Sequence, residues 1–167
     1  MKVFVYCAHS WRLSTALATL KVPKTCPPER PATLKRAWFE DADVIYLRLH
    51  GLPNQSFLYG DGLITALAAS QIRQLDLGGK IVFMEGCFGE SGRVDDAFLA
   101  AGAKFVIGST MATKGRRYRL GPSTLIGGAW LRYVKRGIDP RAALHLAEKK
   151  HPTKLADFKV IGANVDG

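Results

Sequence analysis

The sequence predicts a three-layer α/β/α fold with a mainly parallel sheet of about five or six strands. The main observation is that short, continuous apolar runs alternate with segments of helical periodicity. The composition, 47% hydrophobic and 23% charged residues, is typical of a globular protein. The 167 residues are expected to form one domain, residues 1–167, with the last few residues disordered.

The first half of the chain supplies two of the predicted strands. The run KVFVYC (2–7) predicts the first strand, and RLSTALATLK (12–21) predicts a short helix. A Pro-rich stretch follows, with a helix starting near Leu34. The second strand is DVIYLRLHG (43–51), and a short hairpin is predicted around Phe57–Tyr59. The spacing of apolar residues in ITALAASQIRQL (64–75) predicts an amphipathic helix.

The second half continues the alternation. KIVFME (80–85) and AKFVIGST (103–110) predict the third and fourth strands, separated by a helix in SGRVDDAFLAAG (91–102) that ends at a glycine. Two helices follow, over 123–137 and 139–151. Asp139 is expected to cap the second helix and Pro140 to occupy its first position. DFKVIG (157–162) predicts a late edge strand.

Two polar side chains come directly after apolar strands and stand next to glycines. His50 precedes Gly51 after the second strand, and Cys87 follows Gly86 after the third. The carboxyl ends of parallel strands form one edge of the sheet, where sites usually lie. Neighbouring strands are about 5 Å apart, so His50 is expected to reach the Cys87 thiol and activate it. The alternative, that Cys87 only closes a buried strand, stays open.

Common nucleotide and metal motifs are absent from the sequence. The glycines and lysines match neither the P-loop nor the dinucleotide-binding pattern. The cysteines lie far apart, and His145 and His151 are six residues apart, which does not suit a zinc site. No metal and no cofactor are therefore expected.

Three segments together resemble a known family. DVIYLRLHG, LITALAASQIRQLDLGGKIVFMEGC and VDDAFLAAGAKFVIGSTM are similar to the caspase-like cysteine peptidases of the CHAT type, which belong to clan CD. The resemblance covers about two-thirds of the chain. It implies a caspase-like sheet and a hydrolase that needs no cofactor and cleaves peptide bonds through an acyl-enzyme.

The resemblance also assigns roles to residues. Cys87 would be the catalytic nucleophile, His50 the general acid and base, and the Gly51 and Cys87 amides the oxyanion hole. Glu85 is a further candidate at this edge, for orienting His50 or binding substrate. An inactive interaction module of the same fold is the alternative to a peptidase, and a basic nucleic-acid-binding domain is another.

The net charge of +10 is concentrated in the last third of the chain. Residues 104–167 contain 13 Lys and Arg against 4 Asp and Glu. This excess suits either a solvated basic surface or an acidic partner such as nucleic acid. In the loop TKGRRYRLGPS, Arg116, Arg117 and Arg119 are candidates for substrate binding.

The sequence also predicts a location. Three widely spaced cysteines and the lack of a signal peptide favour a reducing, cytoplasmic setting. No apolar run is long enough to cross a bilayer, so a membrane partner is not expected. The resemblance implies a peptide or protein substrate.

Overall fold

The fold is centred on a six-stranded sheet, seen in a computed structural model that describes residues 1–87, 93–109, 120–154 and 157–162. The strand order is β2-β1-β3-β7-β8-β9, and each neighbouring pair is parallel except β8 and β9. The strands are β1 (Val3–Ala8), β2 (Lys24–Cys26), β3 (Val44–Arg48), β7 (Ile81–Met84), β8 (Phe105–Ser109) and β9 (Phe158–Gly162). The predicted mainly parallel sheet is confirmed.

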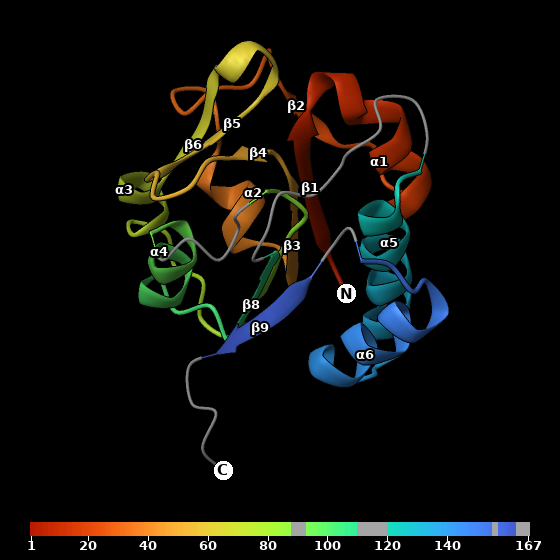
Figure 1. The fold of residues 1–167 in the computed structure, drawn as a ribbon. Coiled ribbons are helices and arrows are strands. Elements are labelled where there is room, and N and C mark those ends of the chain that lie inside the picture. Colours follow the sequence, from red (N-terminus) through yellow and green to blue (C-terminus); the bar gives the residue numbers. More distant parts are fainter. Residues whose placement is uncertain (88–92, 110–119, 155–156, 163–167) are drawn as a thin grey trace.

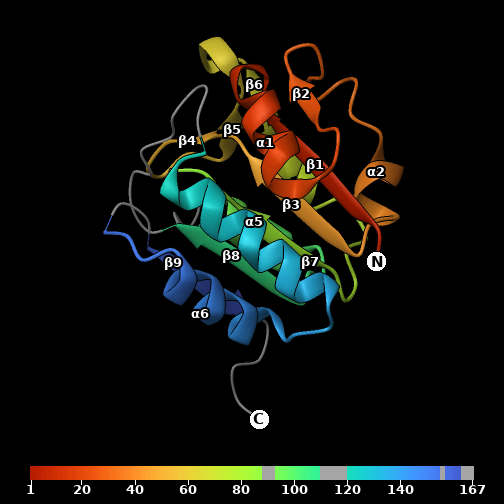
Figure 2. The same cartoon turned by 90° about the vertical axis from the view of Figure 1, so that its right-hand side faces the viewer.

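Helices cover both faces of this sheet (Figures 1 and 2). On one face, α5 and α6 bury Trp130 and Leu144 against Tyr46 and Phe83 of the sheet, and α1 packs beside α5. On the other face, α2, α3 and α4 pack on the alternate side chains of the same strands. The helices are α1 (Arg12–Thr19), α2 (Arg36–Glu40), α3 (Ala69–Ile72), α4 (Val94–Ala100), α5 (Pro122–Lys135) and α6 (Pro140–Lys150). This is the predicted three-layer α/β/α arrangement.

A second, three-stranded antiparallel sheet lies at the carboxyl edge of the main sheet. It has the order β4-β5-β6, with β4 (His50–Gly51), β5 (Phe57–Tyr59) and β6 (Thr65–Ala68). Short 3-10 turns stand at η1 (His9–Trp11) and η2 (Asp61–Leu63). The segment predicted as one strand over 43–51 therefore divides at Leu49 between the two sheets.

Two local predictions differ from the structure. The predicted helix over 64–75 is wrong in its first half, because Leu67 of β6 pairs with Leu58 of β5 and both side chains enter the core. Tertiary pairing thus overrides the helical pattern, which is kept only in α3. The Pro-rich stretch around Cys26, where no strand is predicted, contains β2, and the Cys26 side chain is buried.

The last helix and the last strand agree with the predictions from the local sequence. The Asp139 carboxylate accepts hydrogen bonds from the backbone N–H groups of Arg141 and Ala142, at 2.9 and 3.2 Å, and Pro140 begins α6. The predicted late edge strand is β9, which runs antiparallel to β8. The final residues, 163–167, lie outside the described part. Among the helices that the structure describes, none combines the length and the apolar character needed to cross a bilayer.

Candidate functional site

His50 and Cys87 stand where the main sheet gives way to the smaller one. β3 ends at Arg48, and the chain turns through Leu49 into β4, which begins at His50. β7 ends at Met84, and Gly86 and Cys87 follow in a turn. Because β3 and β7 are parallel neighbours, both turns lie at the same edge of the sheet.

The backbones of these two turns are in direct contact. A Cβ atom built on Gly51 would overlap the carbonyl oxygen of Cys87, and one built on Gly86 would lie 2.5 Å from the carbonyl oxygen of Leu49. Side chains larger than hydrogen do not fit at either position. The two glycines beside His50 and Cys87 therefore allow residues 49–51 and 86–87 to lie side by side.

An aromatic side chain holds the imidazole of His50. The Trp11 and His50 rings have their centroids 4.3 Å apart, and the Arg48 guanidinium carbon lies 5.0 Å from the Trp11 ring centre. Trp11 belongs to the 3-10 turn that follows β1, so the chain segments after β1 and at the end of β3 both contribute to this cluster. Both His50 and Cys87 are half-buried. The sequence-predicted pair is thus brought to one place with its histidine ring packed.

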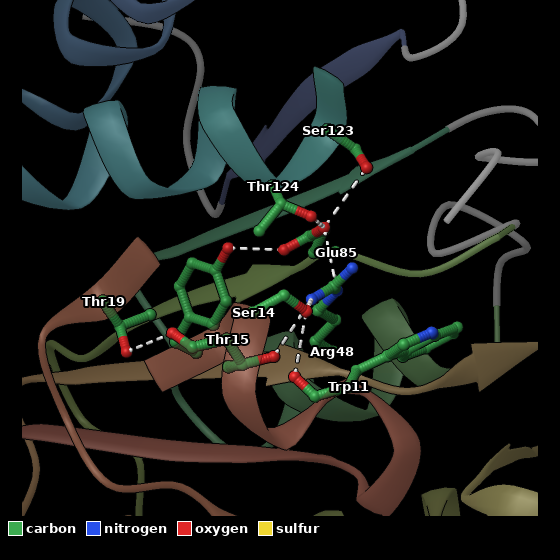
Figure 3. A network of polar contacts seen from close by, with 9 residues as sticks. Trp11, Ser14, Thr15, Thr19, Arg48, Glu85, Ser123 and Thr124 are labelled. Atoms are coloured by element: carbon green, nitrogen blue, oxygen red, sulfur yellow. Dashed lines mark hydrogen bonds and ion pairs between the residues drawn. The ribbon is translucent and has the colours of Figure 1, made fainter. Parts of the chain in front are cut away.

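Glu85 lies inside the protein, on the same side of the sheet as α5. Its carboxylate accepts hydrogen bonds from the hydroxyl groups of Tyr46 at 2.6 Å, Ser123 at 3.2 Å and Thr124 at 2.5 Å (Figure 3). Arg48 Nε lies 3.1 Å from the same carboxylate, and both side chains are at most 2% exposed. We expected Glu85 to face a substrate; its observed partners instead give it a structural role.

Burial and the neighbouring Glu85 carboxylate both raise the pKa of the Tyr46 phenol. Because Tyr46 is fully enclosed and next to Glu85, the pKa of its phenol lies well above its ordinary value. The phenol therefore stays protonated and donates to Glu85.

Arg48 connects this network to α1. Its Nη1 donates to the hydroxyl groups of Ser14 at 2.6 Å and Thr15 at 3.2 Å. Within the described residues its Nη2 is buried and makes no hydrogen bond. The Arg48–Glu85 pair therefore connects β3, β7, α1 and α5, and its two members precede His50 and Cys87 by two residues in the chain.

This ion pair is not among the predicted residues, although the sequence contains a signal for it. One arginine interrupts the apolar run of β3, and one glutamate directly follows the apolar run of β7. In the parallel register Leu47 is opposite Met84, which places Arg48 and Glu85 at the next step. Opposite charges one step beyond matched apolar strands indicate a buried ion pair.

The remaining predicted residues divide into two groups. Gly51 and Cys87, the expected oxyanion donors, have backbones in contact, as described above. Arg116, Arg117 and Arg119 lie outside the described residues. The oxyanion and arginine roles stay predictions.

Comparisons with known proteins give no family for the chain. No protein-family profile and no curated protein match it. Among solved structures, it is similar to the pyridoxal kinase from Staphylococcus aureus. In complex with AMP-PCP and pyridoxal, that kinase has 12% identity and a TM-score of 0.40, over 98% of this chain and 99% of that chain. A second structure of the same kinase has 11% identity and a TM-score of 0.41, and its complex with AMP-PCP has 10% identity and a TM-score of 0.42, each over 98% of this chain and 99% of that chain.

The predicted family is corrected at this point. No family profile and no curated protein supports the assignment to caspase-like cysteine peptidases of the CHAT type, and the solved structures reported above are pyridoxal kinases. The assignments as a hydrolase and as an inactive module of that fold are corrected with it. The pattern behind the resemblance, apolar strands that end in glycine-flanked polar residues, is common at the carboxyl edge of parallel sheets. Because the TM-scores are near 0.4, the activity of these kinases is not assigned to this chain.

Proposed function

We propose that the chain carries a reactive-thiol site in which Cys87 is the nucleophile and His50 its proton acceptor. The observation that supports this best is the contact between the Gly51 backbone and the Cys87 carbonyl, which fixes the two turns side by side. A histidine beside a cysteine takes up the thiol proton and favours the nucleophilic thiolate.

The proposed chemistry needs a partner with an electrophilic carbon, such as a carbonyl group. The Cys87 proton passes to His50, and the sulfur forms a bond to the carbon. The electron pair of the broken C=O π bond moves to the oxygen, which takes the proton back from His50. The sum is an addition of the thiol across the carbonyl, with no redox partner.

The other two cysteines do not compete for this role. Cys7 and Cys26 are buried, whereas Cys87 is half-buried. Burial raises the pKa of the Cys7 thiol to about 12, and burial also raises the pKa of Cys26. Both therefore stay as unreactive thiols at neutral pH.

Alkylation of the native protein tests the proposal. Iodoacetamide at pH 7 is expected to give one adduct, at Cys87, about tenfold faster than it modifies a free thiol such as glutathione. His50→Gln should remove this advantage. His9→Gln is the matched control, because the His9 ring contacts Thr25 instead, at 3.3 Å. Peptide mapping by mass spectrometry gives the sites and rates.

Two outcomes would end the proposal. One is a Cys87 rate no higher than that of glutathione, and the other is an unchanged rate in His50→Gln. In denaturant all three cysteines should react, which confirms that burial protects Cys7 and Cys26 in the native state.

We further infer a cytoplasmic location, because three free cysteines suit a reducing compartment. Nucleic acid as a partner, a peptide or protein substrate and a one-domain organisation stay predictions.

A further inference from the structure

The outer side of α1 (Arg12–Thr19) and the residues directly after this helix carry a group of exposed apolar side chains. Leu13 is 67% exposed, Leu17 66%, Leu20 73% and Val22 93%. Leu13, Leu17 and Leu20 follow one another at helical spacing, opposite the side of α1 that buries Ser14, Thr15, Ala18 and Thr19. We call Leu13, Leu17, Leu20 and Val22 the leucine face. Single exposed leucines are ordinary, but four such side chains within ten residues form a patch.

Leu20 occupies a position where the fold does not need a leucine. It ends α1 with a φ of 55°, in the left-handed region that glycine adopts without steric cost. Its side chain is largely exposed, so it adds little to the core. A leucine here is unfavourable for the backbone and is not compensated by packing within the chain.

Only positive charges accompany this face along α1 and the helix that packs beside it. The sequence has no Asp or Glu in 1–28 or in 97–138, which includes all of α1 and α5. Arg12 and Lys21 lie next to the leucines in the chain. Arg132 of α5 reaches α1 by donating to the Ala18 carbonyl at 3.4 Å.

Lys135 adds a fourth positive charge near the end of α1. Its pKa is lowered by partial burial and by the neighbouring Lys21. Within the part of the chain that the structure describes, none of Arg12, Lys21, Arg132 and Lys135 forms an ion pair. Their charges are therefore available to an acidic partner.

The position of α1 narrows the choice of partner. Figure 2 shows α1 and α5 on the near side of the molecule, outside the sheet. Side chains that are two-thirds exposed or more project from this surface and do not line a groove, which is what a bound peptide helix needs. A second copy of the chain would bring the same positive charges together. A lipid surface accepts projecting apolar side chains, and its anionic headgroups pair with lysine and arginine.

We propose that the leucine face, with the surrounding cations, docks the protein on an anionic lipid surface. The leucines enter the outer part of the acyl layer, and Arg12, Lys21, Arg132 and Lys135 contact the headgroups. This mode involves no spanning segment, so it is compatible with the absence of a long apolar helix in the described residues. It is independent of the chemistry at Cys87.

Vesicle co-sedimentation tests the proposal. The full chain is expected to bind vesicles of phosphatidylcholine mixed with phosphatidylserine, and to bind pure phosphatidylcholine about tenfold more weakly. Raising the salt concentration should weaken binding to the mixed vesicles.

Variants of the leucine face make the test specific. Leu17→Ser and Leu20→Gly should each weaken vesicle binding about tenfold. Leu20→Gly should leave the thermal stability unchanged or raised, since glycine suits the left-handed backbone. Leu146→Ser is the matched control, because Leu146 is an exposed leucine on α6, away from α1, and should bind like the original protein.

Three results would overturn the proposal. The first is no binding to either vesicle, and the second is unchanged binding in both leucine-face variants. The third is binding to soluble poly-glutamate or to DNA without binding to vesicles, which would assign the positive surface to a protein or a nucleic acid instead.

Discussion

Arg48→Met is expected to lower the free energy of unfolding by about 3–5 kcal/mol. Arg48 and Glu85 are almost fully buried, and their side chains lie 3.1 Å apart. Methionine fills a similar volume but leaves the Glu85 carboxylate without a positive charge in the interior. The free-energy cost of this unpaired buried charge is much larger than the net stabilisation that the ion pair provides. The net stabilisation is small because both charges lose their hydration when the pair forms in the interior. Urea denaturation, with the slope unchanged, measures the difference.

Two further variants separate the charge effect from simple loss of packing. Arg48→Met combined with Glu85→Gln should recover most of the loss, because the neutral amide oxygen can still accept from Ser123 and Thr124 while its NH2 group donates to the Tyr46 hydroxyl oxygen. Arg36→Met is the exposed control. Arg36 pairs with Glu40 at 2.8 Å, but its side chain is 62% exposed, so the cost should stay below about 1 kcal/mol. A loss of that small size in Arg48→Met would contradict the argument.

The main sheet was predictable because its strands are buried on both faces. Runs such as Ile81–Met84 are apolar without interruption, and in a 167-residue chain helices must cover such strands. The strands of the smaller sheet gave weaker signals. Thr65–Ala68 has a helical composition and becomes a strand only because it pairs with β5. Such a pairing depends on the tertiary fold and cannot be read from the residues of the segment itself. Lys24–Cys26 is too short to show any period.

The candidate site was predictable in its position and less so in its chemistry. The rule that parallel strands end at one edge placed His50 and Cys87 near each other, and the adjacent glycines explain how closely the turns pack. The family did not follow from this, because strand ends of many α/β proteins share such a pattern. The prediction that Glu85 faces a substrate was wrong. A carboxylate two residues before a predicted nucleophile suggests a functional role, and only the structure shows that Glu85 is paired with the buried Arg48.

Gly51→Ala is expected to disturb the candidate site more than any other single methyl group. The new Cβ would overlap the Cys87 carbonyl oxygen, which belongs to the backbone and cannot rotate away. The turn at 86–87 must therefore move relative to His50. We expect a loss of about 1–3 kcal/mol in the free energy of unfolding, as for other overpacked sites. Cys87 should also react with iodoacetamide at the rate of a free thiol.

Gly78→Ala is the matched control for this change. A Cβ at Gly78 would meet only the Asp76 carboxylate, at 3.5 Å, which is an ordinary contact. The variant should keep both its stability, within about 0.5 kcal/mol, and the Cys87 reactivity. If Gly51→Ala loses stability but keeps fast alkylation, the contact between the turns supports the fold and not the thiol. If it keeps both, the close approach of 49–51 and 86–87 is not rigid, and the placement of His50 beside Cys87 loses its main support.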